Sequence, residues 1–166
     1  MMQEWMRLMQ PGEPHEKLKQ HAGEWEATTR VWMGGPGTPA QEAKGTAVSR
    51  PILGGRFMQM DYSGSMMGMP MTGLGFMGYD NARNLYTSYW LDSMGTTVHS
   101  SKGQFDAEGK VLTLYGEMDE PALDVFGRMV RYVYTFESAD RYRFEIFDLH
   151  AGEDYRMMEI VYKRKK

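Results

Sequence analysis

The amino-acid sequence predicts an all-β protein: an antiparallel up-and-down barrel of about ten strands, preceded by one or two short helices. Three observations support this fold class. From Trp25 onward, apolar and polar residues alternate with a period of two, which is typical of strands that bury one face. The breaks between these runs are short and rich in Gly, Asn, Asp and Ser, as turns are. No break is long enough for a crossover helix, so neighbouring strands are expected to pair antiparallel.

The first 24 residues are expected to form a helical segment, and residues 25–166 the barrel of a single domain. Trp5, Leu8 and Met9 follow the spacing i, i+3, i+4, which predicts a short amphipathic helix that a Pro-Gly pair ends. Acid and proline then open a second short helix, which ends before the next glycine. One face of this second helix is expected to carry Leu18, His21 and Ala22.

The remainder of the chain divides into ten alternating runs. The expected strands cover residues 25–33, 43–52, 56–62, 71–79, 85–92, 97–105, 110–117, 128–137, 141–148 and 155–163. A sheet of ten strands with one apolar face has two exposed edges, and closing the sheet into a barrel removes both. A sandwich of two sheets remains the alternative.

Composition excludes several kinds of site. The chain has no cysteine, so disulfides, thiolate metal sites and cysteine nucleophiles are absent, and a cytoplasmic location is expected. The net charge of −3 gives no reason to expect nucleic acid as a partner. Glu4 interrupts the apolar N-terminus, which argues against a secretion signal. No apolar run approaches the roughly 20 residues that a membrane helix needs, so no membrane partner is expected.

One motif resembles the calycin group, which comprises lipocalins, fatty-acid-binding proteins and nitrobindin-like haem barrels. Gly23-Glu24-Trp25 is a Gly-x-Trp motif at the entry to the first strand, directly after a short helix. The resemblance implies that Trp25 closes one end of the barrel. It also implies that a basic residue near the C-terminus, Arg164 or Lys163, lies over the indole ring.

A second resemblance covers nearly the whole chain and points to the bacterial domain-of-unknown-function family 1579. It is carried by Pro11-Gly12-Glu13-Pro14-His15, Gly23-Glu24-Trp25, Leu53-Gly54-Gly55-Arg56-Phe57, Gly78-Tyr79-Asp80-Asn81, Tyr89-Trp90-Leu91-Asp92-Ser93-Met94-Gly95 and Met158-Glu159-Ile160-Val161-Tyr162. The resemblance supports a barrel and implies no activity, because the family has no assigned one.

We expect the barrel to bind a small hydrophobic or amphipathic molecule in its lumen, because a barrel of this size leaves room for one small ligand. The candidate lining combines apolar bulk with a few polar tips: Met58, Met60, Tyr62, Tyr86, Ser88, Trp90, Asp92, Arg131, Tyr132 and Tyr134. Aromatic residues and methionines are also numerous enough to fill the lumen completely. The alternative is therefore a packed interaction or oligomerisation module, and a homodimer remains open.

The strand that carries Trp90 has bulky side chains on both faces. Tyr86, Ser88, Trp90 and Asp92 share one face by parity, and the opposite face carries Leu85, Thr87, Tyr89 and Leu91. We expect the Trp90 face to point inward, because a binding lumen needs polar groups that orient its ligand.

No enzymatic signature is present. The chain has no nucleophile elbow, phosphate loop or dinucleotide fingerprint, so no enzyme and no cofactor are expected. Carboxylates nevertheless lie within four apolar strands, at Asp61, Asp92, Glu145 and Glu159. Pairing with arginines such as Arg56, Arg128, Arg131 or Arg143 is the expected explanation. The alternative is an enzyme that uses Asp92 as acid or base.

Seven methionines fall within twenty residues, between Met58 and Met77. The segment Ser63–Pro70, which contains Met66, Met67 and Met69, is expected to be a hairpin loop that forms a pliable flap over the barrel mouth. Two other interpretations remain open. The loop contacts a ligand or a partner subunit, or its Met-x-Met spacing binds Cu(I), which prefers sulfur ligands.

The four histidines form no metal-binding pair. His15 and His21 lie near helix ends and are expected at the surface or in caps. The resemblance to nitrobindin-like barrels leaves haem binding open, with His99 or His150 as the ligand to iron.

Overall fold

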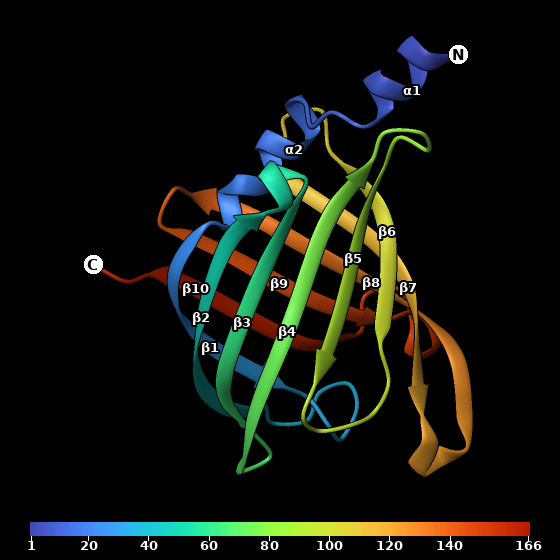
Figure 1. Cartoon of the computed structure of the whole chain (residues 1–166). Coiled ribbons are helices and arrows are strands. Elements are labelled where there is room, and N and C mark those ends of the chain that lie inside the picture. The colour runs from blue at the N-terminus through green and yellow to red at the C-terminus, as the bar shows by residue number, and fades with distance from the viewer.

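The computed structural model describes all 166 residues, and ten strands follow one another around a closed barrel (Figure 1). The strands are β1 Gly23–Val31, β2 Gln41–Ile52, β3 Phe57–Met66, β4 Met69–Asp80, β5 Leu85–Asp92, β6 His99–Phe105, β7 Val111–Glu120, β8 Val125–Ser138, β9 Arg141–Asp148 and β10 Arg156–Arg164. The helices are α1 Met2–Leu8 and α2 Glu13–Leu18, and the single turns of 3-10 helix are η1 Lys19–His21, η2 Leu53–Gly55, η3 Pro121–Leu123 and η4 Leu149–Ala151.

Every strand pairs antiparallel with its neighbours in chain order, and β1 also pairs with β10. The closing register runs from Trp25 opposite Arg164 to Val31 opposite Met158. The expected antiparallel up-and-down barrel is therefore confirmed, and the sandwich alternative is wrong. The closed ring leaves no strand edge unpaired.

One end of the barrel is closed around Trp25, whose side chain is 1% exposed. The indole Nε1 donates a hydrogen bond of 2.8 Å to the carbonyl oxygen of His21. The guanidinium of Arg164 lies over the indole ring, 4.2 Å from its centroid. Position 23 favours glycine, because its φ is 126° and a Cβ there would lie 2.1 Å from Nη1 of Arg164. The expected contact between Trp25 and a C-terminal basic residue is confirmed.

The N-terminal segment covers this same end (Figure 1). Leu18 of α2 belongs to the buried core, and the Tyr86 hydroxyl donates to the Pro14 carbonyl at 3.2 Å. The side-chain amide of Asn81 donates to the carbonyls of Leu8 and Gln10, at 2.9 and 2.8 Å. Helix α1 itself buries no residue. The segment that follows α1 therefore closes the barrel, while α1 lies outside it.

The prediction of a loop over Ser63–Pro70 is wrong. Strands β3 and β4 continue through this segment to the pair Met66–Met69, and only Met67-Gly68 remain as the turn. Both turn residues have positive φ, 51° and 76°, which a two-residue hairpin between twisted strands requires. Met66 lines the interior, whereas Met67 and Met69 are exposed. The methionines thus belong to a strand hairpin, and no flap exists here.

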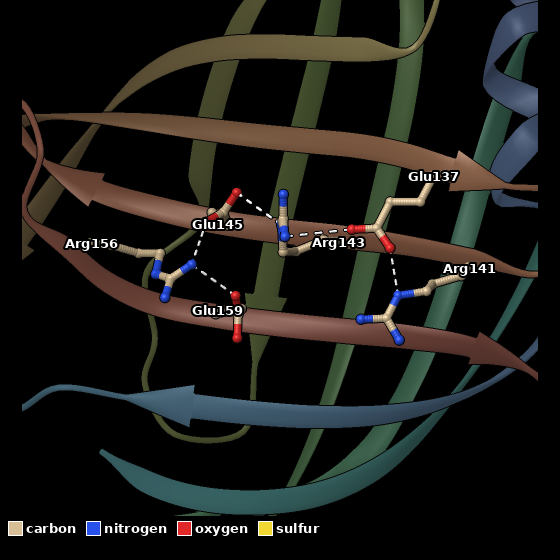
Figure 2. Close-up of polar contacts among 6 residues, drawn as sticks. All are labelled: Glu137, Arg141, Arg143, Glu145, Arg156 and Glu159. Atoms are coloured by element: carbon tan, nitrogen blue, oxygen red, sulfur yellow. Dashed lines mark hydrogen bonds and ion pairs between the residues drawn. The ribbon is translucent and has the colours of Figure 1, made fainter. Parts of the chain in front are cut away.

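Charged side chains occupy the outer face of β8, β9 and β10, where they form one network (Figure 2). Arg143 pairs with Glu145 at 3.1 Å and with Glu137 at 3.4 Å. Arg156 bridges Glu145 and Glu159 at 2.7 and 2.8 Å. Glu145 and Glu159 are each only 8% exposed, so removing an arginine would leave a nearly buried carboxylate unpaired.

Replacing Trp25 with Ala is expected to lower the free energy of unfolding by about 3–5 kcal/mol, because it removes a large buried aromatic ring. Urea unfolding measures this loss. Trp5→Ala is the matched control, since Trp5 lies on α1 and is 61% exposed, and it should change stability by less than about 0.5 kcal/mol. Equal effects of the two substitutions would contradict the closing role of Trp25.

Candidate functional site

The barrel interior holds a cavity of about 210 Å³. Its wall is mostly apolar, and seven of the lining side chains are methionines: Met58, Met60, Met66, Met71, Met77, Met118 and Met158. Aromatic rings form much of the remainder, from Tyr62, Trp90, Tyr132, Tyr134, Phe144 and Tyr162. The lumen is therefore not packed solid. Its size exceeds the roughly 150 Å³ of an engineered apolar cavity that binds benzene.

Eight of the ten side chains expected to line the lumen lie on this wall: Met58, Met60, Tyr62, Ser88, Trp90, Asp92, Tyr132 and Tyr134. The other two, Arg131 and Tyr86, do not line this cavity. Arg131 alternates with Tyr132 and therefore points outward, where its guanidinium lies 4.6 Å from the centroid of the Phe147 ring. Tyr86 does point inward, but it lies under the helical segment and packs against Tyr79 and Phe105.

Trp90 is held in the lumen by a contact with a glycine and by a hydrogen bond. A Cβ at Gly73 on β4 would lie 2.3 Å from the indole, so only glycine leaves room for the ring. The indole Nε1 donates to Oδ2 of Asp92 at 2.7 Å, and Oδ1 of Asp92 accepts from the Met94 backbone N–H at 2.9 Å. Both carboxylate oxygens are thus used to hold the ring and the start of the β5–β6 connection.

Asp92 is the one strand carboxylate of the four that lines the cavity. Asp61 pairs with Arg50 at 2.5 Å, and Glu145 and Glu159 belong to the network on the outer face. The expected pairing with arginine is therefore correct for these three, although Arg50 and Arg156 are the main partners. No Lys or Arg side chain lines the cavity.

Unpartnered polar atoms gather around the cavity. Of the five buried side-chain N or O atoms without a hydrogen-bond partner, three belong to lining residues: Nε2 of His21, Oγ of Ser49 and the Tyr132 hydroxyl. Buried polar groups normally have partners, so this concentration indicates a place where a partner is supplied from outside the chain. Burial also raises the pKa of Tyr132 to about 12, which keeps its hydroxyl protonated.

His21 is a site residue that sequence reasoning missed. Instead of lying at the surface, it is fully buried among the rings of Tyr134, Phe136 and Tyr142, with centroid distances of 4.7–5.2 Å. Its Nδ1 lies 3.1 Å from the Leu18 carbonyl, which can only accept a hydrogen bond. Nδ1 therefore carries the proton of the neutral ring, and Nε2 has a free lone pair. The sequence did contain one sign of this burial, because His21 was expected on the same helix face as the apolar residue Leu18.

The closed end of the interior carries no cation near neutral pH. Burial lowers the pKa of His21 to about 4, because the imidazolium ion has no water around it there. His99 also lines the cavity, on the strand next to Trp90. The wall thus combines apolar area with a few neutral polar groups.

The residues present do not fit a haem. His150 is exposed in η4, outside the lumen, so it is not placed to bind iron there. His99 does line the cavity, but the cavity offers no lysine or arginine for the two carboxylates of a haem. The structure also contains no cluster of three or more His, Asp or Glu residues that would hold a metal ion.

A family model described as "Protein of unknown function (DUF1579)" matches residues 10–164. The chain belongs to this family. A search of curated protein sequences gave no match. No helix in the chain combines the length and apolar character that crossing a membrane would take.

Solved structures of similar fold include Rv2717c from M. tuberculosis. It is 13% identical, with a TM-score of 0.65, and the match covers 94% of this chain and 100% of that one. The S-type phycobiliprotein lyase CPES from Guillardia theta is 12% identical, with a TM-score of 0.58 and coverage of 93% and 94%. These identities show a shared barrel fold and nothing further. This DUF1579 member therefore shares its barrel fold with both solved structures.

Stability of this DUF1579 protein is expected to fall between pH 6.5 and pH 4 because of His21. The unfolded imidazole binds a proton at its ordinary pKa of 6.5, whereas the folded one does so only at about 4. Acid therefore favours the unfolded chain, and linkage gives a loss of about 1 kcal/mol between pH 7 and pH 5.5. Urea unfolding at both pH values measures the loss. His21→Phe should remove most of it, and His150→Phe should not.

Adding a methyl group at Gly73 is expected to displace Trp90 into the lumen, because the built Cβ lies 2.3 Å from the ring. The Nε1–H signal of Trp90 in a ¹H–¹⁵N spectrum should shift strongly in Gly73→Ala. Gly75→Ala is the matched control. Its Cβ would lie 3.3 Å from the same ring, so the ring would have to move much less. An unchanged Trp90 signal in Gly73→Ala would contradict this account of the wall.

Proposed function

We propose that this protein binds a small hydrophobic or amphipathic molecule in the lumen of its barrel and catalyses no reaction. The observation that carries the proposal is the apolar cavity of about 210 Å³, with unpartnered polar groups on its wall. Pockets for small molecules combine apolar area, which provides affinity, with a few polar groups that fix the orientation. The wall around Trp90 and Tyr132 has this composition.

The energetic cost of an empty cavity supports binding over a purely structural barrel. Protein interiors are normally packed as densely as organic crystals. Measured cavities cost about 24 cal/mol per Å³, so 210 Å³ corresponds to a cost on the order of 5 kcal/mol. A ligand that fills the space recovers part of that free energy. A module that acts only through its outer surface gains nothing from leaving the lumen unfilled.

The methionine wall suits a ligand that is not matched in shape to a rigid pocket. Thioether side chains are unbranched and polarisable, so they adapt to irregular shapes and make favourable contacts with aromatic rings. Met58 and Met77 are buried at the side of the cavity, and Met66 and Met71 line it from the β3–β4 hairpin. This wall favours an aromatic or otherwise apolar body in the ligand.

An enzyme is the alternative, because one protein of similar fold is a phycobiliprotein lyase. That likeness concerns the fold alone. The lumen carboxylate of Asp92 accepts hydrogen bonds at both oxygens, from the indole of Trp90 and from the Met94 backbone, so it acts as a structural acceptor. These contacts favour binding over acid–base chemistry at Asp92.

The test is titration with 2-methylnaphthalene, an uncharged aromatic hydrocarbon, followed by calorimetry and by the Trp90 indole signal. We expect one molecule to bind per chain and to shift that signal. Trp90→Ala should weaken binding about tenfold, because it removes a large apolar contact, with the fold checked by circular dichroism.

Trp5→Ala is the matched control, since Trp5 lies on α1, is 61% exposed and does not line the cavity. It should leave the affinity unchanged. The proposal fails if the hydrocarbon does not bind, or if both variants bind it as the unaltered protein does.

A further inference from the structure

The closed end of the lumen carries two neutral polar groups that no part of the chain satisfies. Nε2 of His21 is a hydrogen-bond acceptor, because Nδ1 holds the proton against the Leu18 carbonyl. Ser49 pairs in register with Gly23, the residue that follows the helical segment, so its hydroxyl lies at the same end. A serine hydroxyl both donates and accepts. This end of the wall therefore offers one fixed acceptor and one adaptable partner.

These two groups are not solvated surface groups. His21 is 2% exposed and Ser49 is 4% exposed, and both belong to the wall of the cavity. An unsatisfied buried polar group destabilises the empty barrel, so a hydrogen-bond partner that arrives with the ligand recovers free energy on binding. A hydroxyl or N–H group on the ligand supplies the donor that Nε2 of His21 lacks. A hydrocarbon supplies none.

The charge of the wall restricts the ligand further. The cavity has no Lys or Arg, and burial lowers the pKa of His21 to about 4, so the closed end offers no cation near neutral pH. Asp92 is the one carboxylate among the lining residues. A ligand carboxylate would lose its hydration without gaining a cationic partner, and it would also share the lumen with a like charge.

We propose that the lumen selects an uncharged molecule with an apolar, preferably aromatic, body and a hydroxyl or N–H donor at the end that enters first, with His21 as the acceptor. This inference rests on the proposed binding function, and it names the chemical class of the ligand. Phenols, alcohols and N–H heteroaromatics belong to this class. Fatty acids and other carboxylates do not.

Three probes of one shape test the inference near neutral pH: 2-naphthol, 2-methylnaphthalene and 2-naphthoate. They differ only in carrying a hydroxyl, a methyl or a carboxylate group on the same ring. We expect the naphthol to bind about tenfold more tightly than the hydrocarbon, and the naphthoate to bind more weakly than both. Calorimetry gives the three dissociation constants.

Two substitutions identify the acceptor. His21→Phe keeps a ring among Tyr134, Phe136 and Tyr142 but removes both nitrogens. His21→Asn keeps an N–H for the Leu18 carbonyl, but its own acceptor, Oδ1, lies on a shorter side chain and does not reach the position of Nε2. In both variants the ratio of naphthol to hydrocarbon affinity should fall to about one. His150→Phe, at an exposed site outside the lumen, should leave the ratio at its original value.

The outcomes separate this inference from the proposed function. Equal affinity for naphthol and hydrocarbon, or a preference that survives both His21 substitutions, overturns the inference while binding in the lumen stands. Tight binding of the naphthoate overturns the exclusion of carboxylates. Failure of all three probes to bind overturns the proposed function, and the inference falls with it.

Discussion

Strand β1 is the first strand of the barrel and β10 the last, and their pairing closes the barrel. The register of this pair runs from Trp25 opposite Arg164 to Val31 opposite Met158. Antiparallel hairpins alone would produce a curved sheet with two free edges. The Arg164 guanidinium lies over the Trp25 ring, and Gly23 leaves the space that this contact requires. The closing pair, the helical cover above it and the enclosed lumen therefore all depend on one junction.

Closure divides the side chains into two environments with opposite chemistry. Every strand alternates, so charges collect outside, where Glu145, Arg156 and Glu159 satisfy one another. Inside, bulky rings are placed against small residues, as Trp90 is against Gly73. The space left between them is mostly apolar, and its wall includes Asp92 but no lysine or arginine. Such a lumen is better suited to an uncharged ligand than to an anionic one.

Rv2717c and CPES share the barrel fold at only 13% and 12% identity. This agrees with a fold that depends on the separation of inner and outer side chains rather than on particular residues. A barrel needs alternation, turns and closure, and many sequences meet those requirements. What a lumen binds depends on the particular groups that point into it, and these differ freely between proteins of one fold. The chemistry of His21, Ser49 and Trp90 is therefore a more direct guide to this protein than its neighbours are.

Local pattern determined most of the architecture from the sequence alone. The period of two and the turn residues are short-range properties, so they predicted all ten strands. Parity put Ser88, Trp90 and Asp92 on one face, and the polar groups of that face predicted that it points inward. Tertiary structure decided the rest, because it depends on contacts between distant segments. Pairing of β3 with β4 replaced the expected loop Ser63–Pro70 by a two-residue turn. The helical cover buried His21, and β2 brought Ser49 to the same end of the lumen.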